Sequence, residues 1–145
     1  MTEFIRERVI RFSDCDPAGI VFYPQYFVMF NGLVEDWVTD ALGVPYAGLI
    51  GPRRVGLPTV RLEVDFKAVS RHGDPVRLAL RLERLGSRSL TLEVACRGAG
   101  TDDIRMQMRQ VLVTTSLETH RSTEMPPDLR AGLKRWMSGS ASSPA

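Results

Sequence analysis

The chain has 145 residues, of which 43% are hydrophobic and 25% are charged, and its formal net charge is only +2. This composition is typical of a globular protein, and the length is enough for one domain that buries its core without disulfides. A nearly neutral chain is not expected to be a general nucleic-acid binder. No apolar run approaches the ~20 residues of a membrane span, and the N-terminus lacks the basic-then-apolar pattern of a signal peptide, so we expect a cytoplasmic protein.

The numbers of cysteine and lysine residues bear on three kinds of site: disulfides, metal sites and phosphate-binding sites. Cys15 and Cys96 are too few for a disulfide framework, and neither has a CxxC partner, so we predict no metal site. Lys67 and Lys134 are the only lysines, which leaves 17 arginines among the 19 basic residues. Arginine suits bidentate phosphate contacts. The same bias also arises from the composition of a genome, so it identifies no ligand by itself.

The first predicted element is a strand at residues 4–12, where apolar side chains alternate between two faces. One face is expected to carry Phe4, Ile10 and Phe12, and the other Ile5 and Val9. The strand leads directly into an acidic turn.

The acidic turn precedes a helix. Asp16-Pro17 and Ala18-Gly19 are turn signals, because proline fixes its own φ and disfavours a helical residue before it. The helix is therefore expected to begin after residue 20, with Pro24 in its first turn. This order holds a carboxylate close to unpaired N–H groups, where a developing oxyanion is stabilised. Such a carboxylate can attack a carbonyl or activate water. Alternatively, Asp14 or Asp16 only caps the helix or closes the turn.

A long amphipathic helix is predicted from this turn to about Leu42. Apolar residues recur three and four positions apart at Tyr26, Phe30, Leu33, Trp37 and Ala41. Gly43 supplies a C-terminal cap. About 18 residues at 1.5 Å each give roughly 27 Å of helix, which is long for a domain of this size and must lay its apolar stripe on a sheet.

Four further strands follow, each alternating between apolar and polar residues. They are predicted at residues 60–67, 76–82, 90–96 and 104–113, with turns at 72–75 and 86–87 and a longer loop at 98–103. The first of the four is expected to bury one face, made of Val60, Leu62, Val64 and Phe66. In the last, the apolar positions change phase beyond Gln110, which predicts a β-bulge there.

A short amphipathic helix is predicted at residues 127–137, which would complete a single domain of residues 1–137. Residues 138–145 have almost no apolar content and are expected to form a disordered tail. The order strand, long helix, four strands and short helix predicts an α+β domain. Its simplest form is an antiparallel sheet wrapped around the long helix, which is the layout of the hot-dog fold. The other face or the edge of the sheet is then free for a second subunit.

The segment from Asp14 to Tyr26 resembles the active-site segment of hot-dog acyl-CoA thioesterases. The similarity is greatest to the 4-hydroxybenzoyl-CoA thioesterase branch, whose catalytic aspartate lies in a run like Asp14-Cys15-Asp16-Pro17-Ala18-Gly19-Ile20-Val21. Further similarity at Gly56-Leu57-Pro58, Asp65-Phe66 and Asp74-Pro75-Val76 extends the resemblance over about residues 5–115.

The resemblance implies that Asp16 is the catalytic carboxylate and that the backbone N–H of Tyr23 donates to the thioester carbonyl. In that family the aspartate either attacks the carbonyl or deprotonates water. An ordinary carboxylate is a weak base at neutral pH, so the nucleophilic route is easier unless burial changes its basicity. Because a thiolate is a good leaving group, neither a strong acid nor a cofactor is expected, and coenzyme A is part of the substrate.

The resemblance also implies where the substrate binds. Asn31 stands where the 4-hydroxybenzoyl enzyme has an acidic residue that contacts the phenol, so we expect another aryl, an arylacetyl or a short acyl group. The family's basic cluster for the CoA phosphates is reduced to Arg84 and Arg88. Tyr26 and Pro58 are expected to line the substrate site. Active sites of this family lie between the subunits of a dimer, often paired into a tetramer, so we expect a homodimer or homotetramer.

The same segment bears on four alternative functions. A Cys15 nucleophile needs an activating histidine, but neither His72 nor His120 lies in this segment, which also argues against the hot-dog hydratases and dehydratases. A serine-triad esterase needs a G-x-S-x-G elbow, which the sequence lacks. A non-catalytic module that binds acyl-CoA or acyl carrier protein remains open. The Asp16 carboxylate argues against it, because a pure binding site gains nothing from a negative charge beside a thioester oxygen.

Overall fold

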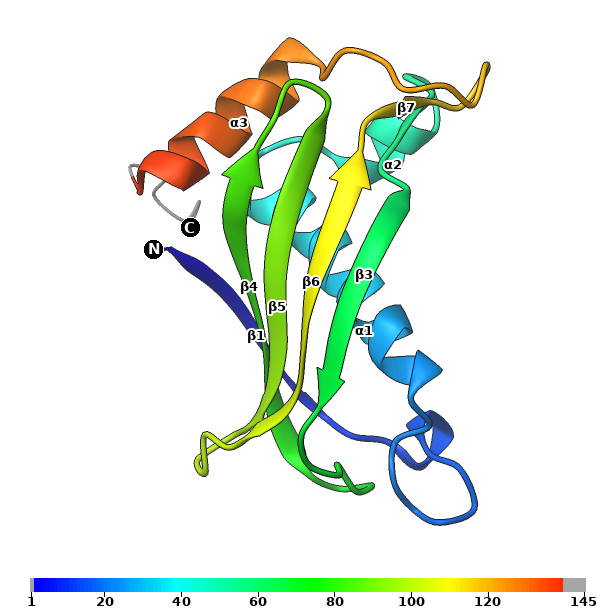
Figure 1. The fold of residues 1–145 in the computed structure, drawn as a ribbon, viewed down its shortest axis with the longest axis vertical. Helices are drawn as coiled ribbons and strands as arrows, with labels where there is room; N and C mark the ends of the chain where they lie inside the picture. The colour runs from blue at the N-terminus through cyan, green and yellow to red at the C-terminus, as the bar shows by residue number, and fades with distance from the viewer. Residues whose placement is uncertain (1, 140–145) are drawn as a thin grey trace.

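The computed structural model describes residues 2–139 (Figure 1). Its strands are β1 (Glu3–Val9), β2 (Val55–Gly56), β3 (Thr59–Phe66), β4 (Pro75–Leu85), β5 (Ser89–Gly98), β6 (Ile104–Val113) and β7 (Thr115–Ser116). Its helices are α1 (Pro24–Asp36), α2 (Tyr46–Ile50) and α3 (Pro127–Ser138). A 3₁₀ turn, η1 (Phe12–Asp14), precedes α1, and a π-helical turn, η2 (Trp37–Ala41), continues it. The predicted α+β order of elements is confirmed. No helix within the described residues has both the length and the apolar character needed to cross a membrane.

Five antiparallel strands form one sheet in the order β1-β4-β5-β6-β3, and α1 lies across one of its faces (Figure 1). The central strands β4 and β5 alternate between the two faces, which places Leu80 and Leu92 fully in the core. Each such side chain contributes about 1.5–3 kcal/mol by its burial. The opposite face carries ion pairs such as Arg81–Glu93, so this sheet buries one face only.

The helix α1 occupies the centre of the hydrophobic core. Phe30, Leu33 and Trp37 of the predicted stripe are all buried. Together α1 and η2 cover residues 24–41, and Gly43 follows with φ +74°, the left-handed conformation that a C-terminal cap requires. The predicted length, the apolar stripe and the glycine after the helix are confirmed.

The helix α3 packs against the end of this central helix. The Trp136 ring stands 6.0 Å from that of Trp37 and 6.3 Å from that of Phe4, both edge to face. Gly132 permits the close approach, because a Cβ there would lie 2.9 Å from the Leu42 carbonyl oxygen.

Most predicted boundaries shift by one to three residues, and two of the differences lie at the ends of the chain. β1 ends at Val9 because the Asp14 carboxylate accepts the Arg11 N–H and draws the chain into η1. Phe12 therefore leaves the core face, and its ring is 71% exposed. Helix α3 extends to Ser138, which lies inside the predicted tail. Residues 140–145 of that tail lie outside the described residues.

The prediction that β3 buries one face is wrong for the single chain. Val60 is 60% exposed, Leu62 41% and Phe66 53%. The reason is position, because β3 pairs with β6 alone and forms an edge of the sheet within the described chain. The link from β3 to β4 is accordingly a crossover, with β5 and β6 lying between the two strands.

The β-bulge predicted within β6 beyond Gln110 lies instead in its partner β3, whose register shifts between Thr59 and Arg61, opposite Leu112 and Val111. β6 keeps its phase, so that Met108, Gln110 and Leu112 are all buried. Gln110 is accommodated there because its Nε2 donates to Thr59 Oγ1 at 2.8 Å. In β6 the register shift against β5 occurs instead at Arg105.

Candidate active site

The acidic turn lies at the lower end of the sheet in Figure 1, just before α1. Its first carboxylate, Asp14, is buried, and its Oδ2 accepts from Arg8 Nη2 at 2.9 Å and from the Arg11 N–H at 2.8 Å. The Asp14 carbonyl accepts from the Phe22 N–H at 3.0 Å, which brings the end of the turn back to its beginning. Asp14 therefore has the turn-closing role that the sequence left open for either aspartate.

Asp16 lies at the exposed end of this turn and is partly buried. Its N–H donates to the Ile20 carbonyl at 3.1 Å, and its Oδ1 accepts from the Ala18 N–H at 2.8 Å. Gly19 completes the turn with φ +79°, which glycine adopts at little cost. The second oxygen, Oδ2, has no hydrogen-bond partner among residues 2–139. Asp16 thus presents one fixed and one free carboxylate oxygen.

The start of α1 offers an unpaired donor. Pro24 has no N–H, Gln25 N–H donates to the Phe22 carbonyl at 2.8 Å, and Tyr26 N–H donates to the Tyr23 carbonyl at 3.2 Å. The Tyr23 N–H has no acceptor within the described part of the chain. Because a helix start carries partial positive charge, this N–H is suited to bind an oxyanion.

An exposed aromatic cluster, made of Phe22, Tyr23 and Phe66, lies beside this donor. The Tyr23 ring centroid stands 5.5 Å from that of Phe22 and 6.0 Å from that of Phe66 in β3. Each of the three side chains is about half exposed. Exposed rings of this kind suit an apolar ligand group or the surface of a second subunit.

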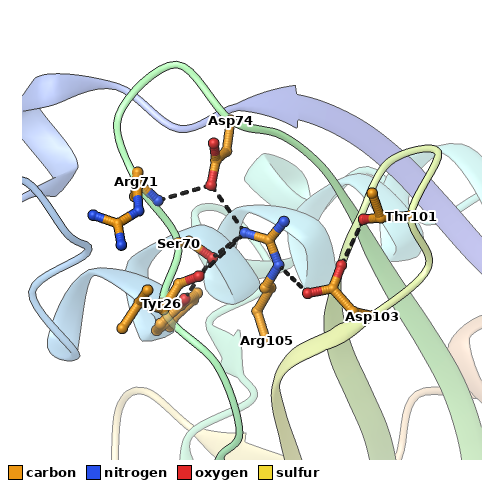
Figure 2. Close-up of polar contacts among 8 residues, drawn as sticks. Tyr26, Ser70, Arg71, Asp74, Thr101, Asp103 and Arg105 are labelled. Carbon is orange, nitrogen blue, oxygen red and sulfur yellow. Dashed lines mark hydrogen bonds and ion pairs between the residues drawn. The ribbon is translucent and has the colours of Figure 1, made fainter.

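The loop before β4, residues 69–74, holds the acidic turn and the helix start together, and we call it the clamp loop. Its Ser70 carbonyl accepts from the Val21 N–H at 2.9 Å. The Ser70 Oγ accepts from the buried Tyr26 hydroxyl at 2.9 Å. Figure 2 shows these residues together with Arg105, which reaches the clamp loop from β6. The clamp loop therefore contacts both parts of the candidate site.

Cys15 is a poor nucleophile in this environment. Burial raises the pKa of its thiol, and the negative charges of Asp14 and Asp16 raise it further. Burial likewise raises the pKa of Cys96 to about 11. The shift at Cys15 agrees with the sequence-based argument against a Cys15 nucleophile. Within residues 2–139, no group of three His, Cys, Asp or Glu side chains is placed to hold a metal ion.

Two residues predicted to bind substrate lie on α1. Tyr26 is 4% exposed and its hydroxyl is bonded to Ser70, so the structure places it in the core, with its ring 6.2 Å from that of Phe66. Asn31 lies further along the helix and is exposed. Only Asn31 of this pair presents a polar group to an incoming molecule.

The other predicted binding residues lie far from Asp16 within one chain. Pro58 is exposed just before β3, and Arg84 and Arg88 lie at the β4–β5 turn, the end of the sheet opposite the acidic turn (Figure 1). Arg88 Nη1 already donates to the carbonyl and hydroxyl oxygens of Ser122 at 3.1 and 3.3 Å. A single chain therefore does not bring these arginines to the acidic turn.

The charged network around Arg105 has no signature in the sequence. Arg105 occupies an ordinary polar position in an alternating strand, and Asp74 stood out only in a turn and in the family resemblance, with no role attached to it. Ser70 gave no signal, although it is 1% exposed. These residues come from separate segments, so no local spacing marks them.

An antiparallel sheet wrapped around one long helix is the hot-dog architecture. The fold is shared with the 1,4-dihydroxy-2-naphthoyl-CoA thioesterase from Synechocystis, with a TM-score of 0.82 and 20% identity over 92% of this chain and 96% of that chain. Residues 10–133 match the model of the thioesterase-like superfamily, and the chain belongs to that superfamily. The predicted fold and the predicted family are confirmed.

Curated relatives are named as thioester hydrolases. The 1,4-dihydroxy-2-naphthoyl-CoA hydrolase of Synechococcus elongatus is 32% identical over 87 residues, which are 59% of this chain and 63% of that protein. The match thus covers less than two thirds of that relative. The 4-hydroxybenzoyl-CoA thioesterase of Pseudomonas sp. is 25% identical over 125 residues, which are 82% of this chain and 89% of that protein.

Proposed function

We propose that this protein is an acyl-CoA thioesterase that hydrolyses an aryl-CoA or short acyl-CoA thioester to the free acid and CoA, with Asp16 as nucleophile or general base. The observation that carries the proposal is the free Asp16 oxygen in a turn that leads to the unpaired Tyr23 N–H. The superfamily match supports the reaction class. The reaction needs water but no metal or redox cofactor, and its CoA substrate fits the cytoplasmic location expected from the sequence.

The two groups have complementary roles in this chemistry. The Tyr23 N–H donates to the thioester oxygen and stabilises the negative charge that develops on it during attack. In the nucleophilic route, Asp16 Oδ2 bonds to the acyl carbon and CoA leaves as the thiolate. Water then cleaves the mixed anhydride to the acid and the free carboxylate, and the proton that this step releases goes to the CoA thiolate. In the base route, Asp16 takes a proton from water as that water attacks the carbonyl, and the proton then passes to the CoA thiolate.

The working unit in this proposal is a homodimer formed at β3. The outer edge of β3 has no neighbouring strand in the described chain, and Val60, Leu62 and Phe66 are exposed on it. An unpaired apolar edge readily accepts another strand, and most homo-oligomers are built on a two-fold axis. Antiparallel pairing of β3 with the partner's β3 would extend the sheet and cover these side chains.

Such a dimer accounts for the separation of the predicted binding residues. Antiparallel pairing sets the start of one β3 beside the end of the other, so the partner's Pro58 comes near the aromatic cluster. The partner's Arg84 and the partner's Arg88 lie at the β4–β5 turn, two to three strand spacings or roughly 10–14 Å from the partner's β3. The phosphopantetheine arm of CoA is long enough to cross this distance. Each site then takes Asp16 and Tyr23 from one chain and its phosphate contacts from the other.

An aryl acyl group fits the surroundings of the site best. Aromatic rings pack favourably edge to face or offset, as the exposed cluster of Phe22, Tyr23 and Phe66 allows. Asn31 presents a neutral amide, so the acyl group need not carry a phenol that pairs with a carboxylate. The two relatives are named for hydroxyaryl-CoA substrates, which supports an aryl group without specifying it.

Free-thiol release from a panel of benzoyl, hydroxybenzoyl, phenylacetyl and straight-chain acyl-CoAs tests the proposed function. We expect turnover with the highest kcat/KM for an aryl or arylacetyl member. If the folded protein binds these thioesters in calorimetry but hydrolyses none of them, the non-catalytic module takes the place of the enzyme. Rapid-quench analysis of one turnover then separates the two routes, since thiol release ahead of acid release requires an acyl-enzyme.

A further inference from the structure

A charged cluster joins the clamp loop to β6 and to the loop before it (Figure 2). At its centre is Arg105, whose side chain is 12% exposed. Its Nη1 donates to Asp74 Oδ2 at 3.0 Å and to Ser70 Oγ at 3.3 Å, and its Nε donates to Asp103 Oδ2 at 2.8 Å. One guanidinium thus joins the clamp loop to the loop that precedes β6.

A β-bulge aims Arg105 at the clamp loop. The register between β5 and β6 shifts between Cys96 and Arg97, where Arg105 is the extra residue. Its carbonyl oxygen accepts two N–H groups at the end of β3, from Lys67 at 2.9 Å and from Ala68 at 3.1 Å. Bulges re-aim side chains in this way and are frequent beside active sites. Regular alternation would instead have placed this side chain on the outer face of the sheet.

The clamp loop in turn contacts the segment from Gly19 to Tyr26 at three points. The Val21 N–H donates to the Ser70 carbonyl at 2.9 Å, and the His72 N–H donates to the Gly19 carbonyl at 3.3 Å. The third contact is the bond from the Tyr26 hydroxyl to Ser70 Oγ. The first two contacts fix the acidic turn, and the third fixes the first turn of α1.

We propose that Arg105 is a positioning residue of the thioesterase site, which sets the placement of the Asp16 carboxylate relative to the Tyr23 N–H through the clamp loop. This inference rests on the proposed function for its kinetic consequence, because both groups must act on the same carbonyl. A misplacement of about 1 Å costs roughly 10²-fold in rate. Substrate affinity depends mainly on the aromatic cluster and the CoA contacts, which Arg105 does not touch. Its loss therefore lowers kcat and leaves KM nearly unchanged.

Arg105→Lys tests the forked geometry of the guanidinium while keeping the charge. A single ammonium cannot bond to Asp103, Asp74 and Ser70 in the directions that the fork provides. Arg109→Lys is the matched control, because Arg109 lies on the same strand and makes two 2.9 Å bonds to Glu83. We expect kcat of Arg105→Lys to fall about 10–100-fold with KM within about 3-fold, and Arg109→Lys to change neither by more than about 2-fold.

Amide hydrogen exchange gives a readout that does not depend on turnover. In Arg105→Lys we expect exchange in residues 16–26 to rise about 10-fold or more, with α3 unchanged. Wild-type exchange in that segment, kcat within about 3-fold of wild type, or a raised KM at constant kcat each overturn the proposal. If the wild-type protein hydrolyses no thioester, the proposed function fails, and the exchange result still decides whether Arg105 holds the segment.

Ser70→Ala is the second variant, to be used if Arg105→Lys does not fold. It keeps the backbone bond to Val21 but removes the oxygen that joins Tyr26 to Arg105. We expect a fall in kcat of about 5-fold or more with KM unchanged, because one of three contacts is lost. Unchanged kcat in the folded Ser70→Ala variant contradicts the positioning role.

Discussion

Asp14 and Asp16 lie two positions apart in the sequence, yet their hydrogen bonds divide their roles. Asp14 is 8% exposed and is held by Arg8 and by the Arg11 N–H. One carboxylate oxygen of Asp16 accepts the Ala18 N–H, and the other has no partner within the described residues. At the scale of single residues, the number of partners within the chain therefore identifies the carboxylate that is available for chemistry.

Asp14→Asn is expected to weaken the fold and spare the chemistry. Asparagine can still accept the Arg11 N–H, but it loses the charge that pairs with Arg8, at a cost of about 1–3 kcal/mol. Urea unfolding measures this cost. At a temperature where the variant is folded, we expect kcat within about 5-fold of wild type. A fully stable Asp14→Asn variant that has lost turnover would contradict the division of roles.

At the scale of elements, the packing of α3 depends on one glycine. Alanine normally favours a helix over glycine by about 1 kcal/mol. At Gly132, however, the new Cβ would lie 2.9 Å from the Leu42 carbonyl oxygen, so Gly132→Ala is expected to destabilise by about 1–3 kcal/mol. At Gly32 in α1 a Cβ meets no atom within 4 Å, so Gly32→Ala is expected to stabilise. Thermal unfolding compares the two variants, and shifts of the same sign would contradict this packing.

The clamp loop should also make stability depend on pH. The Arg71 N–H lowers the pKa of the Asp74 carboxyl below its ordinary 3.8, burial opposes this, and the Arg105 guanidinium lowers it further. Because the pKa of Asp74 is lower in the folded than in the unfolded protein, the ionised carboxylate stabilises the fold at any pH above the unfolded-state pKa. This contribution is lost as the pH falls through the folded-state pKa and the carboxylate is protonated.

Asp74→Asn removes that contribution. The difference in Tm between wild type and Asp74→Asn is therefore expected to be constant from pH 7 to about pH 5 and to shrink below about pH 4. Asp36→Asn serves as the control, since Asp36 is exposed and has no ion pair in the described chain. A Tm difference between wild type and Asp74→Asn that grows as the pH falls would contradict a lowered pKa at Asp74.

The local spacing of apolar residues was enough to predict the elements at the centre of the fold. The stripe of α1 and the alternation of β4 and β5 show their buried faces in the sequence itself. Periodicity did not predict burial correctly where a side chain's surroundings depend on a strand that is distant in the sequence. β3 has an apolar face like its neighbours, but its place at the edge leaves that face exposed. A polar Gln110 at a core position suggested that the strand changes phase there. Its burial is explained by a hydrogen bond to Thr59 on another strand, which the local sequence does not show.

The same distinction applies to the candidate site. Asp16 and Tyr23 belong to one continuous segment, so the sequence was sufficient to propose them. Arg105 reaches that segment only through the clamp loop and a β-bulge, neither of which has a local signature. The separation of the β4–β5 turn from the acidic turn likewise became visible only in three dimensions (Figure 1).

At the scale of the whole molecule, the proposed dimer gives a prediction about the edge strand. Leu62→Glu places a charge on the exposed apolar edge of β3, so we expect monomers in light scattering and a loss of about 10²-fold or more in kcat/KM. Ile5→Glu is the matched control, because Ile5 is 42% exposed on β1 at the other edge of the sheet. An active monomer would contradict a site shared between two chains.

The most direct test of the account is free-thiol release by Asp16→Asn, measured beside wild type and Asp14→Asn on the best substrate of the panel. Fold and oligomeric state are checked by circular dichroism and light scattering. We predict that Asp16→Asn keeps both and loses about 10²-fold or more in kcat. Turnover by the folded, oligomeric Asp16→Asn variant within a few-fold of wild type would contradict the role of Asp16 and the mechanism built on it.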